Sequence, residues 1–189
     1  MSEAGYVFDV ISSDADEEAI GLGVEPRQLP LVLAEAKTDA LLLSKADEIA
    51  AAVLVSADTV VYAANGQVLG KPTDPDDARR MITTLAGTLH KVVTGFCVHD
   101  ARDGRRVGMM IKSDVLMRQL AGDDIEKYVA TGQWQGKAGG YGIQDEPGTA
   151  FGADPFIERL EGELTNVIGL PMPQVIDVLS DFGIEPERS

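Results

Sequence analysis

Two kinds of hydrophobic spacing run along the chain, and the first of them predicts strands. The densest apolar, β-branched run covers residues 53–62 and is typical of a buried strand. Asn65-Gly66 follows it and predicts a tight hairpin turn with positive φ at both central residues, so residues 67–69 should form the returning strand. The segments 89–99 and 105–116 are predicted to form a long antiparallel hairpin.

The second spacing is helical, with apolar residues recurring every three or four positions. It predicts helices over residues 29–43, 122–131 and 171–182. Another helix should begin near Thr73, where a capping residue precedes acidic residues, and end at Gly87. These four helices alternate with the strands.

The remaining short segments complete the predicted fold. Residues 5–11 and 156–160 are predicted as strands, and residues 165–171 as a strand end followed by a turn. Strands that alternate with helices but also form hairpins predict an α/β fold with a mixed central sheet flanked by helices. The length suits a single domain covering residues 1–189, either well buried throughout or elongated with two lobes.

Charge and composition exclude several classes of protein. The formal net charge of -15 excludes general binding to nucleic acid or to an acidic membrane, because both require a basic surface. The apolar runs are too short to span a bilayer, and the sequence does not open with a basic segment followed by an apolar one. The single cysteine, Cys97, excludes an internal disulfide. We therefore expect a cytoplasmic protein.

Asp58 is the first candidate for chemistry, because it lies inside the apolar run. A buried carboxylate without partners costs several kcal/mol, so we expect hydrogen-bonding partners or a metal to hold it. The predicted hairpin would bring Lys71 back toward the strand that carries Asp58. Such a pair suits metal-assisted chemistry on an anionic substrate, whereas the alternative is a structural aspartate beside a solvated lysine.

Three further features each have two interpretations. The acidic segment 12–18 is either a solvated charge run or a source of oxygen ligands for Mg²⁺. Lys37, at the border of an apolar helical stripe, either extends to solvent or binds phosphate. The glycine-rich stretch 136–144 is either a connector or a loop that binds phosphate through bare N–H groups, and its flanking Lys137 and Gln144 favour the binding loop.

Five motifs occur in order along nearly the whole chain, and together they resemble the Maf family of nucleoside triphosphate pyrophosphatases. The motifs are Ser-Ala-Asp-Thr-Val-Val (56–61), Leu-Gly-Lys-Pro (69–72), Leu-Ala-Gly-Thr-Leu-His-Lys-Val-Val-Thr-Gly (85–95), Lys-Ala-Gly-Gly-Tyr-Gly-Ile-Gln (137–144) and Asn-Val-Ile-Gly-Leu-Pro (166–171).

The resemblance implies an activity and a fold. It implies hydrolysis of a nucleoside triphosphate between the α and β phosphates with a divalent cation, Mg²⁺ or Mn²⁺. The Ala-Asp-Thr and Gly-Ile-Gln sequences are similar to the branch that acts on dTTP and UTP rather than on 7-methyl-GTP. The resemblance further implies an elongated Maf/ITPase-like fold and a homodimer.

The resemblance also implies catalytic and metal-binding roles. Asp58 corresponds to the proton acceptor for the attacking water, and Glu17 to a metal-binding carboxylate that would act together with Asp58. Lys71 and Lys37 correspond to phosphate-facing lysines. The chemistry agrees, since lysines and a metal stabilise the charge that develops on phosphate oxygens, and a carboxylate can deprotonate water.

Base recognition is assigned by the same resemblance. Thr59 and Gln144 correspond to positions that set base specificity, and an amide such as Gln144 can pair with a pyrimidine edge as donor and acceptor. Lys137, from the glycine-rich stretch, is the remaining candidate for substrate binding.

The sequence departs from the family pattern at its start. Members usually open with a strand and a turn of the type Ala-Ser-x-Ser-Pro-Arg-Arg, and no Ser-Pro-Arg-Arg occurs here. We expect that roughly twenty residues are absent, together with bidentate phosphate contacts and one strand, which would leave a sheet edge exposed. Two alternatives therefore stay open. One is a catalytically weak nucleotide-binding protein with a regulatory role in cell division, and the other is a generic metal phosphatase that releases inorganic phosphate.

Overall fold

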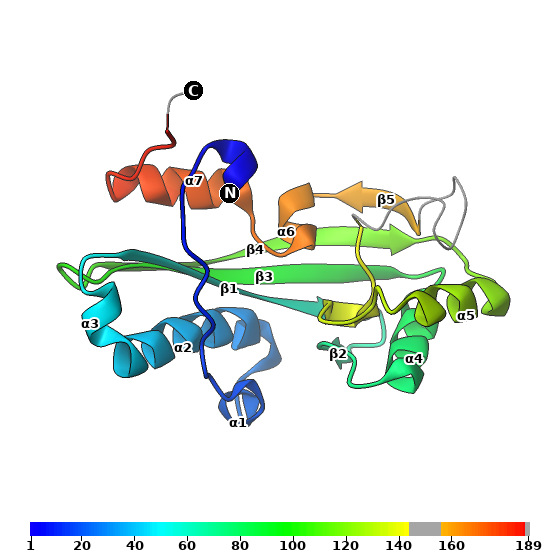
Figure 1. Cartoon of the computed structure of the whole chain (residues 1–189). Coiled ribbons are helices and arrows are strands. Elements are labelled where there is room, and N and C mark those ends of the chain that lie inside the picture. Colours follow the sequence, from blue (N-terminus) through cyan, green and yellow to red (C-terminus); the bar gives the residue numbers. More distant parts are fainter. Residues whose placement is uncertain (144–155, 188–189) are drawn as a thin grey trace. The chain divides into compact units, whose positions relative to one another are not determined.

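The computed structural model describes residues 1–143 and 156–187 (Figure 1). The chain divides into two compact units, and three strands run through both of them. The first unit comprises residues 1–58, 95–110 and 170–189, and the second comprises residues 59–94 and 111–169. The three shared strands are β1 (Val53–Tyr62), β3 (Leu89–Asp100) and β4 (Arg106–Met117).

A five-stranded sheet has the order β2-β1-β3-β4-β5, with β2 at Val68–Leu69 and β5 at Ile157–Glu161. The pairing of β1 with β2 is antiparallel and sets Val61 opposite Leu69. The pairing of β4 with β5 is also antiparallel. The predicted α/β fold with helices flanking the sheet is confirmed, but both of these pairings are antiparallel, where the sequence predicted a mixed sheet.

The hairpin between β1 and β2 forms as predicted, with one difference in its turn. Ala63 N donates to Gln67 O at 2.9 Å, and Gly66 N donates to Ala63 O at 2.9 Å. Gly66 has φ 85°, but in the described chain only glycines have positive φ, so the prediction for Asn65 was wrong. The Asn65 side chain instead accepts a hydrogen bond from Gln67 N at 2.9 Å, which stabilises the turn without a left-handed asparagine.

The first unit contains α1 (Glu17–Gly21), α2 (Leu29–Ser44), α3 (Ala46–Ile49) and α7 (Met172–Asp181), with short 3₁₀ turns at Ser2–Ala4 and Pro26–Gln28. The helices α2 and α7 confirm two predictions. In Figure 1, α2 and α3 lie on one face of the strands of this unit and α7 lies on the other. Helix α2 lies very close to β3, because a Cβ atom added at Gly95 would be 2.3 Å from Leu31 N.

The predicted strand at residues 5–11 does not form. Residues 6–11 are extended but belong to no strand of the sheet. Tyr6 is buried, yet Val7 and Val10 are 78% and 87% exposed. A strand requires a neighbouring strand that accepts its main-chain hydrogen bonds, and the apolar pattern alone does not supply one.

The second unit has a core built on α4 (Pro75–Leu85) and α5 (Gly122–Thr131), two helices that match their predictions. Asp74 caps α4 by accepting from Asp77 N at 2.8 Å. The predicted apolar face of α4 is buried and packs with residues of β3, β4 and α5; its members are Ala78, Met81, Ile82 and Leu85. Trp134 also packs in this core, since it is buried and its indole N–H donates to Val129 O at 3.0 Å.

Residues 165–171 differ from the prediction, because Leu164–Ile168 forms the short helix α6. The β-branched residues Val167 and Ile168 favour a strand in isolation. The Glu163 carboxylate, however, accepts hydrogen bonds from the main-chain N–H groups of Thr165 and Asn166, and this capping starts a helical turn. Gly169, with φ 121°, ends it.

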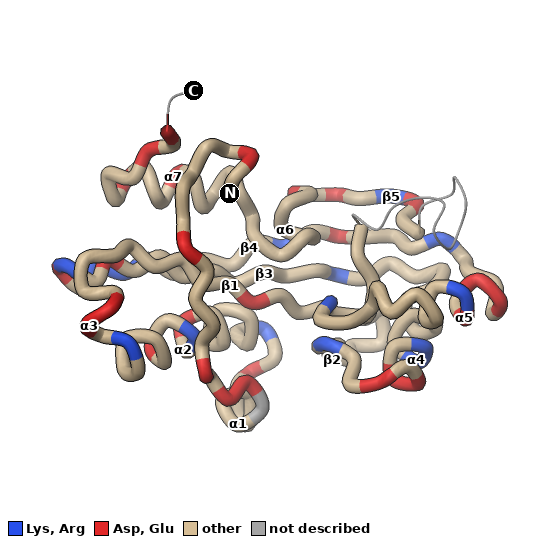
Figure 2. Tube along the Cα trace, viewed as in Figure 1, with Lys and Arg blue, Asp and Glu red and all other residues tan. Residues whose placement is uncertain are grey.

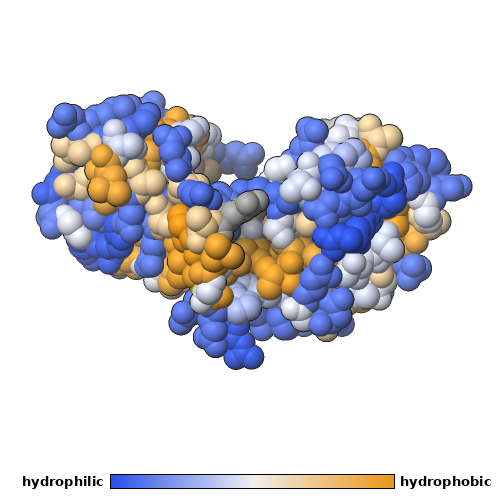
Figure 3. Space-filling view, turned by 90° about the horizontal axis from the view of Figure 1, so that it is seen from below, coloured by the Kyte–Doolittle hydropathy of each residue, from blue (hydrophilic) through white to orange (hydrophobic). Residues whose placement is uncertain are grey.

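Charge and hydropathy are mixed over the surface. Figure 2 shows acidic positions along the segment that leads into α1 and at the start of α4. Figure 3, seen from below, shows separate hydrophobic areas among hydrophilic ones. None of the helices in the described part of the chain has both the length and the hydrophobicity needed to cross a bilayer.

Candidate active site

In the first unit, Lys37 lies between two carboxylates. Its Nζ atom is 2.6 Å from Asp58 Oδ1 and 3.0 Å from Glu17 Oε1. The same ammonium group donates to the main-chain oxygen of Ala57 at 3.3 Å. Three predicted site residues, contributed by α1, α2 and β1, therefore meet at one point.

Local structure explains why these side chains converge. Asp58 lies on β1 with 6% of its side chain exposed, and Lys37 lies on α2 with 16% exposed, so the lysine does not extend to solvent. Glu17 is the first residue of α1, and Asp16 fixes that start by accepting from Ala19 N at 3.0 Å. Glu17 is the most accessible of the three, with 38% of its side chain exposed.

The charge of this cluster is set by its carboxylates. Burial alone would lower the pKa of Lys37, but hydrogen bonding and charge from Asp58, and then from Glu17, raise that pKa above its ordinary value. Lys37 is therefore an ammonium ion at neutral pH. The expectation that a partner holds Asp58 is confirmed, and that partner is Lys37.

The carboxylates of Glu17 and Asp58 are also candidate ligands for a divalent metal ion. Among the described residues, no group of three or more His, Cys, Asp or Glu side chains could hold a metal ion. Glu17 and Asp58 nevertheless converge on one positive charge, and both offer the hard oxygen donors that Mg²⁺ prefers. Mg²⁺ is commonly bound by one or two carboxylates plus substrate phosphates, so this donor set fits a cation that arrives with its nucleotide.

In the second unit, Thr59 belongs to a hydrogen-bonded network. Its Oγ1 atom is 2.8 Å from Thr94 Oγ1, and Thr94 Oγ1 donates to the main-chain oxygen of Asn166 at 2.8 Å. Thr94 and Asn166 are fully buried, whereas Thr59 is half-buried. The network thus joins the predicted base-specificity residue to the interior of its unit.

The lysine and glycine motifs lie elsewhere in the second unit. Lys71 is exposed just after β2, and Gly70 O beside it accepts a hydrogen bond from Gly139 N at 2.9 Å. This bond joins the Gly-Lys-Pro motif to the glycine-rich stretch, in which Lys137 is half-buried. The predicted role of Gln144 falls on a residue outside those described.

Sequence reasoning assigned no function to three buried polar residues of the second unit. They are Thr94, Asn166 and His90, and Nε2 of His90 lies 2.7 Å from the Tyr141 hydroxyl. All three stand within the five family motifs. The available signal was a polar side chain inside a motif on an apolar element, the same signal that identified Asp58.

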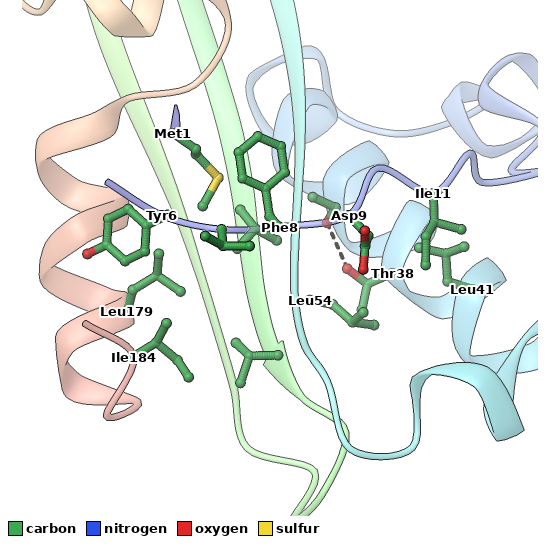
Figure 4. A pocket seen from close by; sticks show the side chains of 14 residues that line it. Met1, Tyr6, Phe8, Asp9, Ile11, Thr38, Leu41, Leu54, Leu179 and Ile184 are labelled. Atoms are coloured by element: carbon green, nitrogen blue, oxygen red, sulfur yellow. Dashed lines mark hydrogen bonds between the residues drawn. The ribbon is translucent and has the colours of Figure 1, made fainter. Parts of the chain in front are cut away.

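A cavity of about 320 Å³ opens in the first unit, but none of the predicted site residues lines it. It lies between the segment 6–11, the start of β1 and the end of α7, and Figure 4 shows Tyr6, Leu54 and Leu179 around it. Ser56 Oγ donates to Ala34 O at 2.6 Å, and Thr38 Oγ1 lies 2.7 Å from Ser56 Oγ, whereas the buried hydroxyl of Tyr6 on the same wall has no hydrogen-bond partner among the described residues. The cavity is mainly apolar and does not suit a triphosphate.

The chain is similar to known proteins over nearly its whole length. The family described as Maf-like protein matches residues 1–182. A dTTP/UTP pyrophosphatase of Pelotomaculum thermopropionicum is 38% identical over 183 residues, which cover 97% of this chain and 90% of the relative. A dTTP/UTP pyrophosphatase of Pyrococcus horikoshii is 34% identical, covering 97% and 91%, and one of Bdellovibrio bacteriovorus is 38% identical, covering 96% and 91%. The chain, with its five motifs in order, belongs to the Maf family.

Proposed function

We propose that this protein is a nucleoside triphosphate pyrophosphatase that hydrolyses dTTP and UTP to the monophosphate and pyrophosphate. The observation that carries the proposal is the buried Asp58 carboxylate held by Lys37 at 2.6 Å. A carboxylate in that state can accept a proton from water, and an ammonium beside it can balance phosphate charge. The three relatives named above carry the same activity in their names.

Asp58 would orient the attacking water and take its proton as the oxygen bonds to the α-phosphorus. The bond between that phosphorus and the bridging oxygen breaks, and the electron pair leaves with pyrophosphate. Lys37, which is charged at neutral pH, would pair with the Asp58 carboxylate and contact the phosphate oxygens. Lys71 and Lys137 of the second unit are proposed to bind phosphate oxygens as well.

A divalent cation fits Glu17 and Asp58, whose oxygens already share one cation, the Lys37 ammonium. When bound, Mg²⁺ or Mn²⁺ would supply Lewis-acid stabilisation of the charge on the phosphate oxygens. Because Lys37 now contacts both carboxylates, it would have to turn from at least one of them toward the phosphates.

The proposal also covers the domain organisation, the base-reading residues, the location and the oligomeric state. We propose that residues 1–189 act as a single domain, which β1, β3 and β4 support because each of them runs through both units. Thr59 and Gln144 are proposed to read the base. A cytoplasmic location and a homodimer complete the proposal.

Product analysis tests the function. The purified chain is incubated with Mg²⁺ and a panel of dTTP, UTP, CTP, dATP and 7-methyl-GTP in ¹⁸O-labelled water, and products are followed by ³¹P NMR and mass spectrometry. We expect pyrophosphate as first product and the label in the monophosphate, with dTTP and UTP preferred. Inorganic phosphate as the first product would identify a generic phosphatase. Nucleotide binding without turnover would identify a catalytically weak binding protein.

A further inference from the structure

Thr94 stands at the centre of a hydrogen-bonded chain in which the direction of every bond is determined. Its Oγ1 lies 2.8 Å from the main-chain oxygen of Asn166 and 2.8 Å from Thr59 Oγ1. A carbonyl oxygen can only accept, so Thr94 donates its single hydroxyl proton to Asn166. The Thr94 oxygen is then an acceptor toward Thr59, and the Thr59 hydroxyl must be the donor.

The side-chain amide of Asn166 is also held in one orientation, because all of its polar groups are engaged. Its Oδ1 accepts from Thr94 N at 3.1 Å, and its Nδ2 donates to Val92 O at 3.1 Å and to Ser113 Oγ at 2.9 Å. A flipped amide would set its NH₂ group against the Thr94 N–H, donor against donor. Since Asn166 is fully buried, no solvent would compensate that loss.

These bond directions determine what the half-buried Thr59 can offer to a ligand. Its hydroxyl proton is used inside the protein, so toward a ligand the oxygen can only accept. Gly169 lies beside this oxygen, since a Cβ atom there would be in ordinary van der Waals contact with it, 3.5 Å from Thr59 Oγ1.

We propose that Thr94 and Asn166 are positioning residues that fix the Thr59 hydroxyl as a hydrogen-bond acceptor for the N3–H group of a uracil or thymine base. The inference rests on the proposed function. UTP and dTTP differ at the ribose 2′ position and at C5 of the base but share N3–H. Cytosine has an unprotonated N3 at that position, so an acceptor facing it would leave two lone pairs opposed and reject CTP.

The first test needs no variant. Binding of UMP and of N3-methyl-UMP to the wild-type chain is measured by isothermal titration calorimetry, and turnover of UTP is compared with that of N3-methyl-UTP. Methylation removes the donor, and we expect binding and kcat/KM to fall at least about tenfold. Equal binding of the two monophosphates within about twofold would overturn the inference.

The second test addresses the direction of the chain. Thr94→Val removes the acceptor for the Thr59 proton and frees that hydroxyl to donate, so the preference for UTP over CTP should fall about tenfold. Thr94→Ser keeps the hydroxyl and should keep the preference. Thr83→Val is the matched control, because the exposed Thr83 on α4 also donates its hydroxyl proton to a main-chain carbonyl, that of Arg79 at 2.8 Å.

A merely structural role for Thr94 would lower kcat/KM for UTP and CTP by the same factor, and that result would overturn the inference. Should Thr94→Val not fold, the comparison of UMP with N3-methyl-UMP still decides. Failure of the inference and failure of the proposed function are distinguishable. If the chain hydrolyses UTP but does not discriminate against N3-methylation, only the inference is rejected. If it discriminates between UMP and N3-methyl-UMP in binding but does not hydrolyse UTP, only the proposed activity is rejected. If it neither discriminates nor hydrolyses UTP, the inference and the activity are both rejected.

Discussion

Lys37 Nζ lies 2.6 Å from Asp58 Oδ1, and this contact joins the middle of α2 to the middle of β1. The two side chains are 16% and 6% exposed, so little water separates or screens them. We expect the pair to stabilise the first unit, and in the proposed mechanism it places a carboxylate where a proton acceptor is needed. Its structural and chemical roles can be separated by substitution.

Asp58→Asn tests the chemical role. The amide has the same shape and cannot take a proton from water, so we expect kcat for pyrophosphate release from UTP to fall about a hundredfold or more. Thermal unfolding and circular dichroism should show a folded protein. Asp47→Asn, on the exposed face of α3, is the control and should keep full activity. A near-normal rate in Asp58→Asn would remove this residue from the role of base.

The stabilising role is measured by a double-mutant cycle with Lys37→Met and Asp58→Asn. Removing one partner leaves the other charge poorly compensated. The double variant should therefore lose less free energy of unfolding than the sum of the losses in the two single variants. We expect a coupling free energy of about 2 kcal/mol by urea unfolding. The surface pair Lys91 and Asp114, 2.6 Å apart with side chains 49% and 25% exposed, is the control cycle and should give less than about 1 kcal/mol. Equal coupling free energies in the two cycles would show that burial does not strengthen the interaction between Lys37 and Asp58.

The sequence predicts most of the elements in this fold because local signals determine them. Helix α4 is the clearest case. Asp74 caps it, and its apolar residues, spaced three or four positions apart, face the core. The strand at residues 5–11 fails for the opposite reason. Its apolar run is a local signal, but a strand exists only with a neighbouring strand, and no strand of the described sheet pairs with it.

The candidate site follows the same rule. Asp58 could be identified because a carboxylate inside an apolar run requires a partner. Which lysine supplies the charge could not be predicted, since Lys37 is 21 positions away and reaches Asp58 only through the packing of α2 on the sheet. The network of Thr94 and Asn166 spans 72 positions, and no local pattern connects the two residues.

The buried His90 predicts a pH dependence of stability. Burial lowers the pKa of His90 from 6.5 to about 4, so the folded protein holds this residue neutral where the unfolded chain takes up a proton. The stability that His90 contributes is complete above pH 6.5 and is lost progressively as the pH falls toward 4. The loss should amount to roughly 3 kcal/mol.

Urea unfolding between pH 4 and pH 7 measures this term as a difference between variants. His90→Gln should unfold with a shallower pH dependence than the wild type over that range. Tyr141→Phe removes the hydroxyl 2.7 Å from His90 Nε2 but keeps the imidazole buried, so it should retain the steep dependence. Parallel curves for His90→Gln and the wild type would show that this histidine does not titrate as its burial requires.

Gly95 links the packing of α2 to the chemistry of Lys37. A Cβ atom at this position on β3 would lie 2.3 Å from Leu31 N and 2.3 Å from the carbonyl carbon of Pro30, both main-chain atoms of α2. Gly95→Ala can therefore be accommodated only if α2 moves away from the strand, which should cost about 3 kcal/mol or more. The same movement would draw Lys37 away from Asp58, so we expect turnover to fall even below the unfolding temperature. Gly122→Ala, where an added Cβ meets nothing within 4 Å, is the matched control and should change neither quantity appreciably. If Gly95→Ala lost stability but kept full turnover, the position of α2 would not govern the contact between Lys37 and Asp58.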